Sequence, residues 1–116
     1  MQDDTTTLSE LKARMANFVR ERDWERFHQP KNLVMSIAIE AAELMEHFQW
    51  ETPELTPERK AEVGEEVADV LAYVLSLANV LELDLSAISA AKMEKNAAKY
   101  PAERERGKET WEGRRD

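Results

Sequence analysis

Apolar residues in this chain recur mainly three and four positions apart, the spacing of a helix with one buried face. The first such stretch predicts a helix from about residue 8 to Arg22. Thr7 with Glu10 three residues later forms a capping-box pattern that marks its beginning. One face of this helix would be formed by Leu8, Leu11, Met15, Phe18 and Val19.

Two longer helices are predicted in the middle of the chain. The second helix should run from about Pro30 to Phe48, because the fixed φ of proline suits the first turn of a helix. The loop "QWETPEL" follows it. Thr56 and Pro57 then read as the N-cap and first residue of a third helix that ends near Leu81.

The remaining chain predicts one more helix and a tail. The fourth helix should begin at residue 85 or 86 and end near residue 99, ahead of Pro101. No segment alternates with the period of a strand, so we expect an all-α fold. The folded domain is predicted over residues 8–101, between a flexible N-terminus (1–7) and a flexible C-terminal tail (102–116).

Composition limits the class of protein. The 116 residues suit one domain, and 34% of them are charged, with a formal net charge of −8 and no cysteine. An acidic chain without a basic surface argues against direct binding of nucleic acid. The first ten residues are acidic and polar, unlike a signal peptide, and no apolar run approaches the ~20 residues of a membrane span. We therefore expect a cytoplasmic protein that binds neither nucleic acid nor membrane.

The second helix is apolar on more than one side. Met35, Ile39 and Ala42 lie away from its main apolar arc. A helix that is apolar nearly all round is buried on several faces, and a single unit of four short helices has too little bulk for that. This pattern predicts a homo-oligomer.

Two of the predicted helices carry acidic pairs with the same placement. A helix advances about 100° per residue, so Glu40 and Glu43 lie about 60° apart at the edge of the apolar arc. Glu66 and Asp69 occupy the equivalent positions on the third helix. If the two apolar arcs pack antiparallel, the four carboxylates converge.

Converging carboxylates favour a hard divalent cation. Unpaired, they would repel one another, and a bound Mg²⁺, Mn²⁺ or Ca²⁺ would remove that repulsion. A di-iron site in a helical bundle requires Glu-x-x-His motifs, which neither His28 nor His47 completes. Zinc is disfavoured by the absence of cysteine and the scarcity of histidine. Each pair alone is typical of a solvated flank in a chain with 24 acidic residues, but the shared placement favours a metal site.

These motifs and the segments around them resemble the MazG-like superfamily of all-α nucleotide pyrophosphohydrolases, whose mark is E-x-x-E, a spacer and E-x-x-D. The segments "ERDWERFHQPKNL", "EAAELMEHFQW", "EEVADVLAYVL" and "KMEKNAAKYP" are similar to its dCTP pyrophosphatase branch. The resemblance covers about residues 8–101. It implies a four-helix MazG-like bundle that assembles as a dimer or a dimer of dimers with sites at subunit interfaces, and we expect the tetramer.

The resemblance also implies an activity. A nucleoside triphosphate would be hydrolysed between its α- and β-phosphates to the monophosphate and pyrophosphate, with Mg²⁺ as cofactor or Mn²⁺ in its place. The implied catalytic residues and metal ligands are Glu40, Glu43, Glu66 and Asp69. One of these four, or Glu62 or Glu65, would orient the attacking water. The expected substrate is dCTP or a 5-substituted dCTP.

Two other functions stay open. One is a house-cleaning hydrolase that acts on other non-standard nucleoside triphosphates. The other is a non-enzymatic acidic module that holds a metal or docks a partner through Trp24 and Trp50.

Substrate contacts are implied for two further groups of residues. The base and sugar would be held by Trp24, His28, Trp50 and Tyr73. The last helix would contribute Lys92, Asn96, Lys99 and Tyr100, three of which recur on one helical face. Taken alone, the tryptophans suit core or interface positions, His28 suits a cap before Pro30, and the lysines suit a solvated stripe. Met15 stands where the branch has a substrate-contacting histidine, which should broaden base tolerance.

Overall fold

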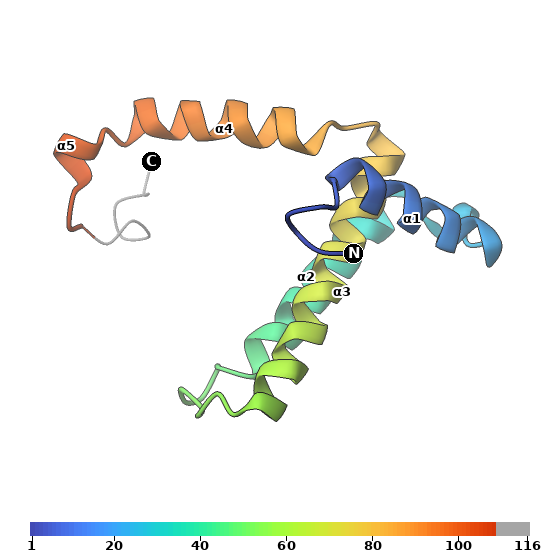
Figure 1. Cartoon of the computed structure of the whole chain (residues 1–116), viewed down its shortest axis with the longest axis horizontal. Coiled ribbons are helices and arrows are strands. Elements are labelled where there is room, and N and C mark those ends of the chain that lie inside the picture. The colour runs from blue at the N-terminus through green and yellow to red at the C-terminus, as the bar shows by residue number, and fades with distance from the viewer. Residues whose placement is uncertain (109–116) are drawn as a thin grey trace. The chain divides into compact units, whose positions relative to one another are not determined.

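The computed structural model describes residues 1–108 of the chain. Figure 1 shows its elements, which are α1 (Leu8–Glu21), the short 3-10 helix η1 (Glu25–Phe27), α2 (Pro30–Glu46), α3 (Pro57–Leu81), α4 (Leu85–Lys99) and α5 (Ala102–Glu105). Residues 1–108 contain no strand, which confirms the all-α prediction. The chain divides into two compact units, one of residues 1–83 and one that begins at Asp84, and each is described by itself.

Side-chain caps set the beginnings of α1 and α3. The Thr7 hydroxyl accepts a hydrogen bond from the Glu10 N–H at 3.1 Å, and the Glu10 carboxylate accepts one from the Thr7 N–H at 3.0 Å. This is the predicted capping box. The Thr56 hydroxyl accepts from the Arg59 N–H at 3.2 Å, and Pro57 is the first residue of α3. Such caps each contribute about 1 kcal/mol to helix stability.

Three features of the helices differ from the sequence predictions. Helix α2 ends at Glu46, because the N–H groups of His47 and Phe48 bond to carbonyls three residues back, which tightens the last turn. Neither η1 nor α5 was predicted. Asp84 caps α4 by accepting a hydrogen bond from the Ala87 N–H at 2.9 Å, a role that we did not assign to it from the sequence. Part of the predicted tail, residues 109–116, lies outside the described residues.

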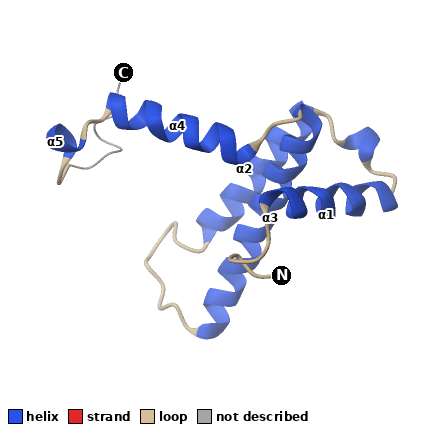
Figure 2. Ribbon diagram, turned by 45° about the horizontal axis from the view of Figure 1, so that its top comes forward, coloured by secondary structure: helices blue, strands red, loops and turns tan. Residues whose placement is uncertain are grey.

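Helices α1, α2 and α3 form the first unit. Helices α2 and α3 lie side by side in Figures 1 and 2 and are joined at one end by the 47–56 loop, so they run antiparallel. Helix α1 packs against α3. The side chains that are buried at the centre of this unit are Val19, Leu33, Leu75 and Ala78. Antiparallel packing places the acidic segments of α2 and α3 opposite one another.

Two hydrogen bonds tie α1 to the C-terminal end of α3. The Asn79 side-chain amide donates to the Lys12 carbonyl at 2.9 Å, and the Lys12 ammonium donates to the Leu83 carbonyl at 2.5 Å. The Leu83 carbonyl lies just beyond the C-terminal end of α3, and the two bonds together fix the position of α1 on α3.

Among residues 1–108, no single helix is both long and apolar enough to cross a membrane. Helices α3 and α4 satisfy the length and composition only when they are taken together across the break between them.

Candidate functional site

Three carboxylates converge between α2 and α3. Glu40 and Glu43 lie one helical turn apart on α2, and Glu66 lies on the facing part of α3. One oxygen from each of these side chains lies within 4.8 Å of the other two. Residues 26 positions apart are therefore brought into one cluster, as the pattern of acidic pairs predicted.

The electrostatics of this cluster disfavour three free negative charges. A hydrogen bond with the Glu43 carboxyl raises the pKa of Glu40, and partial burial raises it further. The negative charges of Glu43, Asp69 and Glu66 act in the same direction. The Oε2 atoms of Glu40 and Glu66 are buried and have no hydrogen-bond partner among the described residues. Buried carboxylate oxygens without a donor are well suited to a cation, and hard oxygen ligands suit Mg²⁺ or Mn²⁺.

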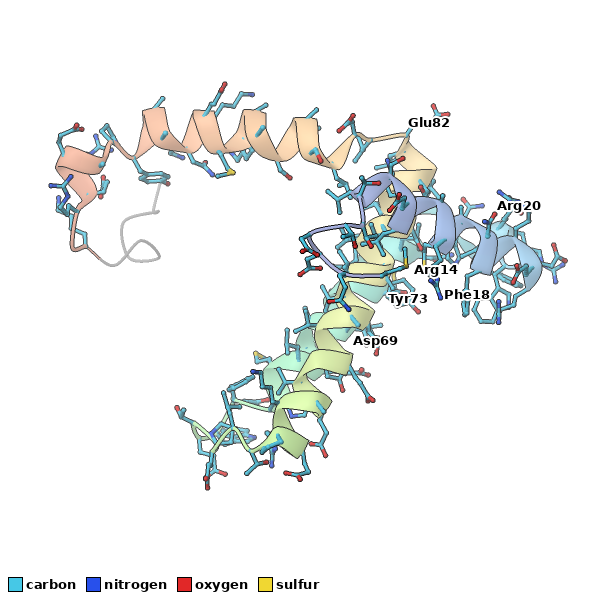
Figure 3. The ribbon with its side chains drawn as sticks, in the orientation of Figure 1. Arg14, Phe18, Arg20, Asp69, Tyr73 and Glu82 are labelled. Atoms are coloured by element: carbon cyan, nitrogen blue, oxygen red, sulfur yellow. The ribbon has the colours of Figure 1, made fainter. Side chains whose placement is uncertain are left out.

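Asp69, the fourth predicted ligand, lies beside the cluster. It is exposed and is not one of the three converging residues, although its charge contributes to the raised pKa of Glu40. Figure 3 shows Asp69 and Tyr73 on α3. They are four positions apart, so both occupy the face of α3 that carries Glu66. The structure therefore places Asp69 at the edge of the candidate site.

His47 is a site residue that the sequence analysis missed. Its Nε2 atom lies 3.9 Å from Glu66 Oε1, and both side chains are largely buried. His47 follows Glu43 by four residues, so the two share a helical face, and this spacing is the signal that could have identified it. His47 places an imidazole nitrogen beside the Glu66 carboxylate from the end of α2.

A small pocket lies next to Tyr73. Its volume is about 230 Å³. It brings together three of the four predicted base-contacting residues, Trp24, His28 and Tyr73. The pocket is completed by residues that the sequence analysis did not single out as contacts, Phe27, Asn32, Leu33 and Ser36. The Trp24 ring packs edge-on against Phe18, with ring centroids 5.9 Å apart, which orients the indole.

Trp50 and Met15 lie elsewhere. Trp50 is 87% exposed in the loop between α2 and α3 and does not line the Tyr73 pocket. Met15 lines a separate hollow of about 300 Å³ between α1 and α3, together with Leu71 and Leu75. Within one chain, neither Trp50 nor Met15 lines the pocket that contains Trp24, His28 and Tyr73.

The substrate contacts that were predicted on the last helix belong to the second unit. Lys92, Asn96 and Lys99 are exposed on α4, and Tyr100 ends that helix by donating its N–H to the Asn96 carbonyl at 2.8 Å. The Lys99 ammonium lies 5.5 Å from the centroid of the Tyr100 ring. These four residues form a cationic and aromatic group within their own unit.

An all-α unit with an acidic cluster between two antiparallel helices, beside an aromatic pocket, is the arrangement expected of a metal-assisted nucleotide site. A model of the MazG-like family matches residues 35–114. The chain therefore belongs to the MazG-like family.

Named relatives include dCTP pyrophosphatase 1 from Homo sapiens, which is 41% identical over 102 residues, covering 83% of this chain and 60% of that protein. The Bos taurus protein of the same name is 38% identical over 107 residues, covering 87% of this chain and 63% of that protein. The chain thus spans less than two thirds of these relatives. A solved pyrophosphatase from Archaeoglobus fulgidus is 43% identical, with a TM-score of 0.74 over 87% of this chain and 98% of that one.

Proposed function

We propose that this protein is a nucleoside triphosphate pyrophosphohydrolase that uses a divalent cation. The observation that carries the proposal is the convergence of Glu40, Glu43 and Glu66, two of which have a buried carboxylate oxygen without a donor. Relatives named as pyrophosphatases support the same reaction class.

The cation would be held by Glu40, Glu43 and Glu66, with Asp69 at the edge of the cluster. Mg²⁺ is the preferred ion, because it combines carboxylate ligands with phosphate oxygens and water, and Mn²⁺ could replace it. When bound, the ion supplies phosphoryl polarisation and a water of lowered pKa. The His47 imidazole lies beside Glu66, and an exposed carboxylate such as Asp69 can orient a water at the edge of the cluster.

The Tyr73 pocket would hold the sugar and base. Tyr73 follows Glu66 by seven residues, or two turns, so the pocket lies along α3 from the carboxylates. The aromatic faces of Trp24 and Tyr73 can stack a base, and His28 offers a polar edge. We propose dCTP or a 5-substituted dCTP as the preferred substrate, which is supported by the relatives named dCTP pyrophosphatase 1.

A wider role on other non-standard nucleotides is favoured by one observation. Met15 stands where the dCTP pyrophosphatase branch has a substrate-contacting histidine, and it lines a separate hollow rather than the Tyr73 pocket, so it offers no polar contact to a base. A less selective site would hydrolyse several modified triphosphates, as a house-cleaning enzyme does.

The test is release of pyrophosphate from a panel of triphosphates in the presence of Mg²⁺. The panel contains dCTP, 5-methyl-dCTP, CTP and the other three deoxynucleotides. We expect pyrophosphate and the monophosphate as products, with dCTP or its 5-methyl form hydrolysed most efficiently and CTP less efficiently. Metal binding without hydrolysis of any of these would instead identify a non-enzymatic metal-binding module.

We also propose that the protein works as a homotetramer, a dimer of dimers. Apolar side chains on α2 remain about half exposed in one chain, among them Met35 at 52%, Ile39 at 56% and Met45 at 55%. An apolar surface of this extent on a small acidic protein is typical of a subunit interface.

A further inference from the structure

His47 lies next to the carboxylate cluster, at the C-terminal end of α2. It follows Glu40 by seven residues and Glu43 by four, so the three side chains lie along one face of the helix. His47 is the C-cap residue of α2 and keeps helical dihedral angles, with φ −67° and ψ −21°. Its side chain is 17% exposed, and its ring centroid lies 6.4 Å from that of Phe48. The imidazole is therefore largely buried beside Glu66 and does not extend into solvent.

The two carboxylate oxygens of Glu66 have different surroundings. Oε1 lies 3.9 Å from His47 Nε2, whereas Oε2 is buried and has no hydrogen-bond partner among the described residues. An ionised carboxylate can only accept hydrogen bonds, so the ring nitrogen that faces it is assigned the hydrogen. The imidazole thus offers a donor to Oε1 and leaves Oε2 for another partner.

The distances around the cluster argue against His47 as a ligand of the same cation. Among the described residues, the ligand atoms that lie within 4.8 Å of one another come from Glu40, Glu43 and Glu66, and His47 is not part of that group. Ligands on opposite sides of one Mg²⁺ are only about 4.2 Å apart, twice the metal–oxygen distance. A cation that binds all three carboxylates is therefore not placed to bind the imidazole as well.

A glutamate ligand benefits from a donor on its outer oxygen. The last torsion of a glutamate side chain is broad, so packing of the stem does not decide which oxygen faces a cation. Metal-binding carboxylates are commonly held by hydrogen bonds from neighbouring groups that do not touch the metal. The separation of 3.9 Å between His47 Nε2 and Glu66 Oε1 is about 1 Å longer than a hydrogen bond, so a small rotation of either side chain would form one.

We propose that His47 is a positioning residue of the metal site, which donates its Nε2–H to Glu66 Oε1 and directs Oε2 toward the cation held with Glu40 and Glu43. The inference rests on the proposed function and deepens it. His47 acts through Glu66 and touches neither metal nor substrate. Such a hydrogen bond supports the ligand whichever hard ion is bound, so its loss weakens the binding of Mg²⁺ and Mn²⁺ alike.

The experiment measures metal binding in the absence of nucleotide. The electron paramagnetic resonance signal of free Mn²⁺ gives the Kd for Mn²⁺, and competition gives the Kd for Mg²⁺. We expect His47→Leu and His47→Asn to bind both ions about ten- to hundredfold more weakly than the wild type. His47→Gln should restore most of the affinity, because its amide N–H reaches about as far as Nε2, whereas the amide of Asn is one methylene shorter. Glu46→Gln changes an exposed neighbour on the same turn and should bind both ions as the wild type does.

Three outcomes would overturn the proposal. The first is wild-type affinity for both ions in a folded His47→Leu protein. The second is equal loss of affinity in the Asn and Gln variants, a comparison that stands even where the apolar variant does not fold. The third is a coupling to a directly bound nitrogen in the pulsed resonance spectrum of bound Mn²⁺ that disappears in His47→Leu, which would make His47 a ligand.

An assay of pyrophosphate release from dCTP separates this inference from the proposed activity. Metal binding that depends on His47 in a protein that hydrolyses no triphosphate would refute the hydrolase proposal and support the positioning role. A wild type that binds neither Mg²⁺ nor Mn²⁺ would refute both.

Discussion

Individual carboxylates between α2 and α3 lie close enough to repel one another. Among the described residues, Glu40 and Glu66 each bury an oxygen without a donor, and the raised pKa of Glu40 reflects its hydrogen bond with Glu43, its burial and the neighbouring charges. A raised carboxyl pKa means that the folded state holds the proton more tightly than the unfolded state does. Ionisation of Glu40 therefore destabilises the metal-free protein at neutral pH, and stability recovers as the pH falls through that pKa.

The first prediction concerns Glu40→Gln. Removal of one negative charge relieves repulsion, so the Tm of the metal-free protein should rise at neutral pH. The same change removes a ligand, so the increase in Tm on adding Mg²⁺ should be lost, together with hydrolysis. Differential scanning fluorimetry with and without Mg²⁺ measures both effects. Glu46→Gln, an exposed acid on the same helix, is the control and should keep the Mg²⁺ response. A full Mg²⁺ response in Glu40→Gln would exclude Glu40 as a ligand.

The second prediction concerns Glu43→Ala and Asp69→Ala. Each should abolish hydrolysis and retain the helical signal in circular dichroism, because both side chains are exposed and pack little. Comparing the two variants distinguishes the role of Glu43, which lies in the carboxylate cluster, from that of Asp69, which lies at its edge. Loss of the Mg²⁺-induced stabilisation in Glu43→Ala, with its retention in Asp69→Ala, would show that Asp69 acts on water or substrate. Near-normal turnover in either variant would remove that residue from the site.

The third prediction concerns Trp50. Because its side chain is 87% exposed, Trp50→Ala should leave the free energy of unfolding of the chain nearly unchanged. Trp50 lies outside the Tyr73 pocket within one chain, so in the proposed tetramer it would stack on a base held by another copy, and its loss should weaken nucleotide binding by about 1–3 kcal/mol. Fluorescence titration with a non-hydrolysable dCTP analogue measures the affinity. A variant that fails to assemble would place Trp50 in a subunit contact instead.

At the scale of elements, the boundaries of the helices follow from local chemistry. The capping box of Thr7, the Thr56–Pro57 pair and Pro30 at the start of α2 all act within one turn of the residue that they fix. The sequence therefore predicted four helices closely. The 3-10 turn η1 and the helix α5 are too short to give a periodic pattern, so they were not predicted.

The fourth prediction concerns Gly64 in the first third of α3. A Cβ atom built on Gly64 meets nothing within 4 Å, and the residue is helical. Gly64→Ala should therefore stabilise the protein by about 1 kcal/mol, because glycine loses more backbone entropy on forming a helix. Urea denaturation measures the change. Destabilisation or dissociation would show that another copy of the chain approaches the helix closely at this position.

At the scale of the whole molecule, the exposed apolar face of α2 is the feature that supports the proposed assembly. Helix α2 uses Leu33 for the core of one unit, yet Met35, Ile39 and Met45 remain about half exposed. A second copy of the chain can bury this face. The free energy of unfolding would then depend on protein concentration, because unfolding would also separate the subunits.

The fifth prediction tests that assembly. Light scattering coupled to size exclusion should give a mass of four times the 13.4 kDa chain for the wild type. Ile39→Lys places a charge on the apolar face of α2 and should dissociate the assembly, while Ile39→Val retains an apolar side chain and should keep it. A monomeric wild type would refute the tetramer.

Much of the candidate site could be predicted because helix geometry is local. The spacing of Glu40 from Glu43, and of Glu66 from Asp69, defines faces on two helices, and an antiparallel hairpin brings those faces together. Trp24, His28 and Tyr73 were also expected near one another and line one pocket. Their catalytic and binding roles stay predictions until the variants are measured.

The features that only the tertiary structure decided depend on contacts between helices that are distant in the sequence. The 3.6-residue period says which face a side chain occupies, but it does not say which neighbour that face meets or how closely. The sequence by itself therefore determined the four longer helices, the caps at Thr7 and Thr56 and the facing acidic pairs. The packing of α1 and α2 on α3 decided that His47 lies beside Glu66, that Asp69 lies at the edge, and that the Ser76 hydroxyl is buried without a hydrogen-bond partner among the described residues.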